Sequence, residues 1–309
     1  MSWSAPLPAL ALVGAVLTAG AGALAMLDHL VGARTAGRPV RLLAALGQPV
    51  ARSALLLLTR RATTPRTDAA AWALAPAVLV GMAAAAVAAV PWDRGVAVAD
   101  VDDGIVLVGA AFAVVMVGVY LHGWAANSPL PLHGGYRFVA LALSYEMPLA
   151  LVLIAAALPA ESLSIGAIVE SQAGTWNVVR QPLGLPLYLV AGAGLAFWGP
   201  LNVPDAGDLG GGTAAEVSGP ARLAWAGAQG AVLTAVAVVG AGVFLGGWHG
   251  PLLPGAAWTA LKALALLALL AGARHRLARV RLERFVVLAW TVLIPLALVD
   301  VFVSGALAL

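Results

Sequence analysis

Long apolar stretches separated by short polar segments make up most of the chain. A hydrocarbon core about 30 Å thick requires about 20 apolar residues per spanning helix. Eight stretches are candidates for such spans, namely residues 6–27, 71–90, 104–125, 136–159, 184–199, 221–247, 255–273 and 285–305. The pattern predicts an all-α polytopic membrane protein with about eight transmembrane helices in a single transmembrane domain, 1–309.

The composition agrees with this prediction and excludes several kinds of chemistry. Hydrophobic residues make up 62% of the chain, charged residues 10%, and the mean hydropathy is +0.96. There is no cysteine, which excludes disulfides, thiolate nucleophiles and cysteine-ligated zinc or iron–sulfur clusters. HExxH, Walker and nucleophile-elbow motifs are also missing. We therefore expect no bound cofactor, no metal and no catalytic residue, and assign any redox centre to a partner.

Arginine is concentrated on one side of the predicted membrane domain. Arg94 and Arg180 are the only two on the other side, and Lys262 lies inside the seventh span. The concentrated set is Arg34, Arg38, Arg41, Arg52, Arg60, Arg61 and Arg66 after the first span, Arg137 and Arg222 at the starts of the fourth and sixth, and Arg274, Arg276, Arg279, Arg281 and Arg284 before the last.

The positive-inside rule turns this distribution into an orientation. It predicts cytoplasmic loops at about 28–70, 126–136, 200–220 and 274–284, with both termini outside the cytoplasm of a bacterial plasma membrane. No basic residue precedes the first span, so we expect that span to be retained rather than cleaved as a signal. Membrane insertion alone demands this arginine distribution, so no nucleic-acid partner is predicted.

Two of these loops have features of their own. Pro49 suits the first turn of an interfacial helix over about 49–60, which serves either a partner or only as a lipid-surface anchor. The loop 200–219 is rich in glycine and carries Asp205, Asp208 and Glu216. We expect it to lack stable structure unless a partner orders it.

Glu146 is the first ionisable residue expected within the membrane. It lies nine residues past Arg137, about 13 Å along the helix and on the opposite face from that arginine. Pro148 should kink the helix at this depth. A carboxyl at mid-membrane is a candidate proton relay, and the alternative is a protonated acid with a purely structural role.

Two more ionisable residues lie in the last two spans. Lys262 is about 18 Å from Arg274 along the helix, a depth that makes it the expected partner of Glu146. Asp300 is about 24 Å beyond Arg284, so we expect its side chain to reach water at the outer interface.

Several motifs in the middle of the chain resemble a known family. They are Gly123-Trp-Ala-Ala-Asn-Ser128, Gly134-Gly-Tyr-Arg137 with Ser144-Tyr-Glu146, Gln181-Pro-Leu-Gly184, Phe244-Leu-Gly-Gly-Trp248-His-Gly-Pro251 and Arg279-Val-Arg281-Leu-Glu-Arg284. In this order, over about 27–298, they resemble the H subunit of NADH-quinone oxidoreductase, the membrane component of respiratory complex I that contacts quinone.

The resemblance implies a subunit without a redox centre, bound to membrane and peripheral partner subunits. Its cytoplasmic loops would help form the chamber in which quinone, the substrate, accepts electrons, and loop carboxylates would couple that reduction to proton translocation. The residues expected on the proton path are Glu146, Lys262, Asp205, Asp208 and Glu216, and those expected at the quinone chamber are Arg137, Arg222, Arg279 and Arg281.

The chain departs from the family pattern where this coupling is concentrated. Phe197 and Asn202 stand where the family has a glutamate and an aspartate, Gly207 replaces another glutamate, and Gln229 and Gly230 stand where the sixth span has an acid. These changes predict a divergent paralogue with altered coupling. The alternative function is a membrane scaffold subunit of a related hydrogenase or ion-transport complex, with neither a quinone chamber nor a proton path.

Overall fold

The structure is a computed structural model that describes residues 6–39 and 42–308, so Arg41 lies outside the described residues. The helices are α1 Pro6–Thr35, α2 Leu42–Leu58, α3 Ala69–Ala88, α4 Gly104–Ala125, α5 Pro129–Ala157, α6 Ile165–Glu170, α7 Asn177–Arg180, α8 Gly184–Leu195, α9 Gly219–Leu245, α10 Gly255–Arg276, α11 Leu282–Leu288 and α12 Ile294–Ala308. Short turns of 3-10 helix are η1 Leu158–Ala160, η2 Gly199–Leu201, η3 Gly207–Leu209 and η4 Gly212–Ala214, and η5 Ala289–Leu293 is a π-helical segment joining α11 to α12.

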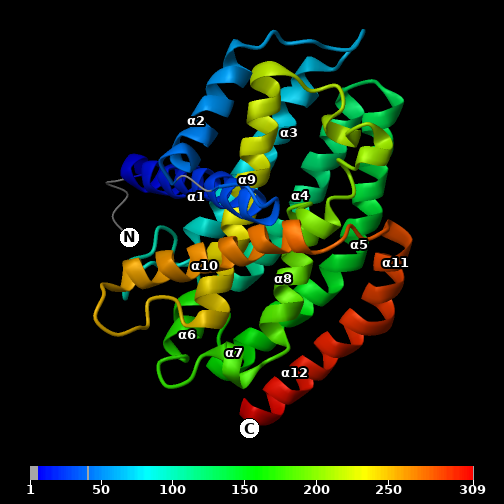
Figure 1. The fold of residues 1–309 in the computed structure, drawn as a ribbon. Coiled ribbons are helices and arrows are strands. Elements are labelled where there is room, and N and C mark those ends of the chain that lie inside the picture. Colours follow the sequence, from blue (N-terminus) through cyan, green and yellow to red (C-terminus); the bar gives the residue numbers. More distant parts are fainter. Residues whose placement is uncertain (1–5, 40–41, 309) are drawn as a thin grey trace.

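The predicted all-α membrane fold is confirmed. Within residues 6–39 and 42–308, seven helices are long and apolar enough to cross a bilayer, with α11, η5 and α12 forming one continuous span. Helix α9 is the centre of the bundle, and its apolar surface is buried nearly all round by α1, α2, α3, α8 and α10. Figure 1 shows α9 upright in the middle, with α10 crossing it at a steep angle.

The fifth predicted span, 184–199, is only partly helical. Helix α8 has 12 residues, about 18 Å, which is too short for a bilayer. The chain then turns at Phe197, whose φ is +39°, and continues through η2. The side-chain amide of Gln229 donates to the carbonyl oxygens of Ala196 and Phe197, at 3.2 and 2.9 Å. An apolar run alone does not distinguish a helix from a buried irregular segment of this kind.

The predicted helix at 49–60 exists with different bounds. Helix α2 begins at Leu42, so Pro49 lies in its interior rather than in its first turn. The apolar residues that precede Pro49 extend the helix backwards, and the helix tolerates the proline at the loss of one backbone hydrogen bond. Val50, Leu57 and Leu58 are exposed along it.

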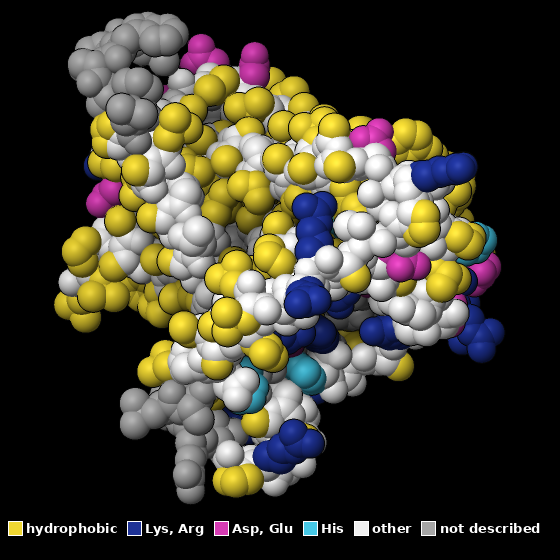
Figure 2. All heavy atoms as spheres, turned by 90° about the horizontal axis from the view of Figure 1, so that it is seen from above, with side chains coloured by type: hydrophobic (Ala, Val, Ile, Leu, Met, Phe, Trp, Pro, Cys, Tyr) yellow, Lys and Arg dark blue, Asp and Glu magenta, His cyan; other side chains and the backbone are white. Residues whose placement is uncertain are grey.

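The predicted cytoplasmic loops lie together at one end of the bundle, which we call the arginine-rich end. The Ala62 amide donates to Ser218 Oγ at 2.7 Å, and the Val280 amide donates to the Pro200 carbonyl at 2.9 Å. Basic side chains, which are arginines, gather on this face in Figure 2. Arg94 and Arg180 lie at the other, arginine-poor end, so the grouping of the arginines is as predicted.

Candidate functional site

The loop 200–219 is folded against the ends of α4 and α5, so the expectation that it lacks structure of its own is wrong. Its three 3-10 turns bury Leu201, Leu209 and Thr213. Gly212 makes this fold possible, because its φ is +53° and a Cβ on it would lie 1.7 Å from the Pro204 carbonyl oxygen. The glycine-rich composition did not indicate a folded loop, because buried apolar residues alternate with the glycines.

Asp205 is the most enclosed carboxyl of this loop. It accepts a hydrogen bond from Thr213 Oγ1, and its own amide donates to Asn202 Oδ1 at 3.3 Å. Burial raises the pKa of Asp205 above its usual value, although Thr213 and the nearby Arg222 oppose that shift. Arg222 itself donates to the Ala214 carbonyl at 2.6 Å. Asp205 therefore binds a proton more readily than a free aspartate.

Asp208 and Glu216 lie in more polar surroundings. Arg137 forms an ion pair with Asp208 at 2.7 Å, and the hydrogen bond of that guanidinium lowers the pKa of Asp208, with a further contribution from Arg279. Glu216 accepts a hydrogen bond from Ser128 at 3.1 Å. The three loop acids Asp205, Asp208 and Glu216, all expected on the proton path, thus have different surroundings. Arg137 reaches the loop, as predicted from its position on α5.

The segment between α10 and α11 adjoins the same loop. Arg279 and Arg281 are exposed on it, on either side of Val280, whose amide joins Pro200. Arg137, Arg222 and Arg279 therefore surround the loop 200–219, while Arg281 caps the start of α11.

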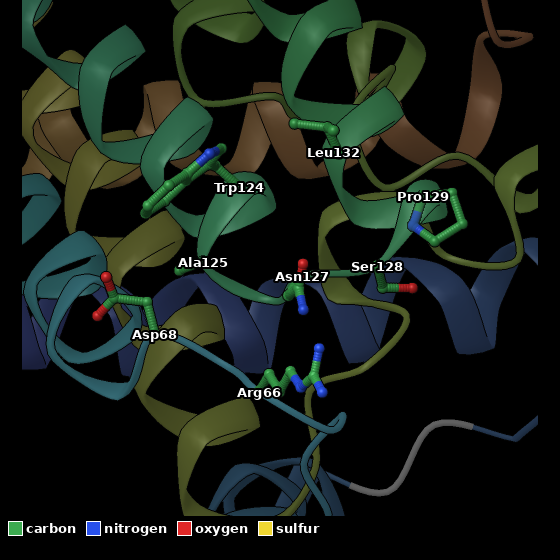
Figure 3. Close-up of a pocket in the computed structure, with 8 residues that line it drawn as sticks. All are labelled: Arg66, Asp68, Trp124, Ala125, Asn127, Ser128, Pro129 and Leu132. Carbon is green, nitrogen blue, oxygen red and sulfur yellow. The ribbon is translucent and has the colours of Figure 1, made fainter.

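A pocket of about 370 Å³ opens at the α4–α5 turn (Figure 3). Its wall includes Trp124, Ala125, Asn127 and Ser128 of the first family-like motif, together with Arg66, Asp68, Pro129 and Leu132. Neither Arg66 nor Asp68 was predicted from the sequence to line a site. The Asp68 amide donates to the Ala125 carbonyl at 3.0 Å, a long-range contact with no local signal.

A second pocket, of about 330 Å³, lies beside the ends of α1 and α10. Asp28 in its wall bonds Arg274 Nη1 at 3.2 Å and His275 Nε2 at 2.8 Å. His29 and Arg38 line it as well. Among the residues that the structure describes, no three His, Asp or Glu side chains lie close enough together to hold a metal ion.

Beneath the loop, a line of buried aromatic rings runs from α3 to α5. His122 stacks on Trp225 with ring centroids 3.7 Å apart, and its Nε2 accepts a 3.4 Å hydrogen bond from Trp72. Trp225 is followed by Phe197 at 5.5 Å, and Phe197 by Phe138 at 5.6 Å. Phe138 in turn lies 6.3 Å from Tyr145. These rings fill the region between the loop and the middle of α5.

Glu146 follows Tyr145 on α5 and is half-buried. Its Oε1 has no hydrogen-bond partner among residues 6–39 and 42–308. It lies near the middle of α5 along the chain.

Lys262 does not pair with Glu146. Its ammonium donates to the carbonyl oxygens of Gly247 at 2.8 Å and His249 at 2.7 Å, and lies 4.2 Å from the ring centre of Trp176. The predicted pairing was wrong because equal depth was taken for contact. The carbonyl groups just after the end of α9 meet the charge instead.

Asp300 does not reach water, contrary to the prediction. The residue is only 2% exposed and lies where α12 packs on α5 and α8. The prediction used only the distance along the helix, which says nothing about the face of the helix that the residue occupies.

Nearly the whole chain matches a known family. The family model described as NADH dehydrogenase matches residues 7–305. The H 1 subunit of NADH-quinone oxidoreductase from Rhodopseudomonas palustris (strain BisB5) is 35% identical over 243 residues, which are 78% of this chain and 76% of the relative.

Two further relatives carry the corresponding designation. The H subunit of NADH-quinone oxidoreductase from Anoxybacillus flavithermus (strain DSM 21510 / WK1) is 34% identical over 258 residues, 81% of this chain and 77% of the relative. The H 2 subunit from Syntrophobacter fumaroxidans (strain DSM 10017 / MPOB) is 32% identical over 270 residues, 84% and 81% of the two chains. The chain therefore belongs to the family of the H subunit of NADH-quinone oxidoreductase, a membrane component of complex I.

Proposed function

We propose that the chain is the quinone-side membrane subunit of a complex-I-like NADH-quinone oxidoreductase in the bacterial plasma membrane. Its arginine-rich end faces the cytoplasm, where it meets the peripheral subunits and contributes to a quinone chamber. The observation that carries the proposal is the joining of the motif Gly123–Ser128 to the loop 200–219, through the hydrogen bond of Ser128 to Glu216. Two segments distant in sequence thereby form one polar surface.

The arginines of this surface have a chemical role in the proposal. Electrons that reach quinone from a partner's redox centre create negative charge on its oxygen atoms. Guanidinium groups fixed nearby stabilise that charge. Arg279 and Arg281 are exposed, so in this proposal they stabilise the negative charge on quinone. Arg137 and Arg222 mainly hold the loop 200–219 in place. In this proposal, the chain supplies no redox centre of its own.

In the proposal, proton coupling differs from that of family members that have carboxylates where this chain has Phe197, Asn202 and Gly207. Asp205 and Glu146 are the two carboxyls best suited to carry protons, since Asp208 and Glu216 engage surface partners and Lys262 is held by carbonyl groups. The aromatic line through Trp225, Phe197 and Phe138 separates Asp205 from the middle of α5. A proton would have to pass around these rings.

An affinity tag on this chain allows the complex to be purified and tested. We expect iron–sulfur subunits to co-purify, and a photoreactive quinone to label the arginine-rich end. Arg279→Gln should lower NADH–quinone turnover. Arg94→Gln is the matched control, since Arg94 lies at the other end and pairs with Glu170 at 2.5 Å. Co-purification without iron–sulfur subunits, or no quinone labelling, would favour the scaffold alternative.

A further inference from the structure

The π-helical segment η5 turns the last part of the chain toward the bundle. Phe285 and Ser304 are both buried, and Ser304 lies nineteen positions after Phe285 in the sequence. At 100° per residue an uninterrupted α-helix would place them about 100° apart. A π-turn inserts about one extra residue into the helix and brings them back to one face. Asp300, one turn before Ser304, therefore points inward as well.

The carboxyl of Asp300 lies at the start of helix α8. Its Oδ2 is 3.2 Å from the position that a Cβ on Gly184 would occupy, and the Phe244 ring lies 3.0 Å from that same position. Glycine at 184 therefore leaves the space that the carboxyl group uses. The partial positive charge at a helix N-terminus favours an acidic side chain here.

Several buried polar atoms in the region of Asp300 lack hydrogen-bond partners. Asp300 Oδ2, Ser304 Oγ and Gln181 Oε1 are all buried and have no hydrogen-bond partner within residues 6–39 and 42–308. Gln181 uses its amide nitrogen to bond the Ala155 carbonyl at 2.7 Å, and its own backbone carbonyl accepts from Gly184 at 3.0 Å. This region therefore holds buried polar atoms that no hydrogen bond between the described residues satisfies.

Among the described ionisable side chains on the elements around Asp300, Arg180 and Tyr188 are engaged elsewhere, and the buried Tyr145 hydroxyl on α5 has no partner. Arg180 on α7 donates to the Ser171 carbonyl at 2.8 Å, and the Tyr188 hydroxyl on α8 donates to the Val236 carbonyl at 2.8 Å. Glu146 on α5 is itself an acid. An ionised carboxylate buried without a cation is strongly disfavoured, so the neutral acid is the form that fits this site.

Helix α8 connects this site to Glu146. Gly305 packs on Leu158, and α5 and α12 run in the same direction, so Asp300 lies level with about residue 153 of α5. That is about 10 Å from Glu146 along the helix axis. At the other end of α8, a Cβ on Gly194 would lie 2.8 Å from the ring of Tyr145, the neighbour of Glu146. Asp300 thus lies at one end of α8, and Tyr145, the chain neighbour of the half-buried Glu146, lies at the other.

We propose that Asp300 is a proton-binding site in the arginine-poor half of the membrane domain, at the N-terminus of α8. The proton exchanges between this carboxyl and the Glu146 side of α8, and its charge as a transient carboxylate is stabilised by the N-terminus of α8. The site itself depends only on the fold. Its contribution to transport rests on the proposed function.

Infrared spectroscopy of the complex in membranes tests the site directly. We expect a carbonyl band of a protonated carboxyl that is lost in Asp300→Asn and that shifts when the membranes are transferred to D₂O. Asp102→Asn, an exposed acid at the arginine-poor end, is the matched control and should leave the band unchanged. A missing band would mean that Asp300 is ionised, and a band that never shifts would mean a structural acid; either result overturns the proposal.

Proton pumping tests the role of the site in transport. In proteoliposomes, Asp300→Asn should lower the protons pumped per NADH oxidised, while Asp102→Asn should not. Unchanged pumping in a fully assembled Asp300→Asn complex would overturn the transport role. If even the unaltered complex pumped no protons, the proposed function would fail, whereas the infrared result would still decide whether Asp300 binds an exchangeable proton.

Discussion

Ionisable side chains are accommodated differently at the arginine-rich end and in the interior of the bundle. At the end, acids meet side chains, as Asp208 meets Arg137 and Asp28 meets Arg274. In the interior, Lys262 meets backbone carbonyls, and Asp300 lies at a helix N-terminus with no counterion among the described residues.

The difference follows from access to water. Exposed ion pairs form and break at little cost because water screens them. An interior charge is tolerated only where fixed dipoles are already in place, and backbone groups at helix ends provide such dipoles. The end should therefore be sensitive to loop conformation and salt, and the interior to the loss of single polar contacts.

Replacing Gly212 with alanine should have the largest effect at the arginine-rich end. The φ of +53° and the clash with the Pro204 carbonyl predict a loss of about 3 kcal/mol in the free energy of unfolding. The measurement is the thermal midpoint of the tagged chain in detergent. Gly207→Ala is the matched control, since its nearest neighbour, Arg279 Nη1, is 4.0 Å away. Equal midpoints for the two variants would show that the loop is not built around Gly212.

Removing the interior cation should have an intermediate effect. Lys262→Met leaves the Gly247 and His249 carbonyls without their donor, which predicts a loss of about 2 kcal/mol. Arg276→Met, an exposed change on the same helix, should stay within about 0.5 kcal/mol. The thermal midpoint of the tagged chain in detergent compares the two variants. If Lys262→Met proves as mild as Arg276→Met, the carbonyl groups do not need the ammonium.

The smallest effects should come from the loop acids, and they should have opposite pH dependence. Asp205 has a raised pKa, so the stability that its proton provides is present in acid and is lost as pH rises. Asp208 has a lowered pKa, so the stability from its pairing with Arg137 is present at neutral pH and is lost in acid.

Thermal midpoints between about pH 3 and about pH 7 test this contrast. Relative to the unaltered chain, Asp205→Asn should gain stability as pH rises, and Asp208→Asn should lose it. Parallel curves for the two variants would contradict the difference in their surroundings.

The sequence predicted what depends on long apolar runs and missed what depends on local geometry. Seven spans and the clustering of arginines were predictable because hydropathy and charge act over whole segments. The contacts of Lys262 were not, because depth along a helix does not identify its neighbours. Asp300 was misplaced because its inward direction depends on the π-turn at 289–293, for which no residue pattern was recognised. The folded loop 200–219 was missed because Gly212 acts through a single close approach.

The short helix α8 also bears on how this protein is made. A segment of 12 helical residues is too short to partition into the bilayer alone, and the peptide groups that follow at Phe197 would be unsatisfied in lipid. The amide of Gln229, which satisfies them, is synthesised some thirty residues later as part of α9. The insertion machinery must therefore hold α8 until α9 emerges, so that the two enter the membrane as a pair.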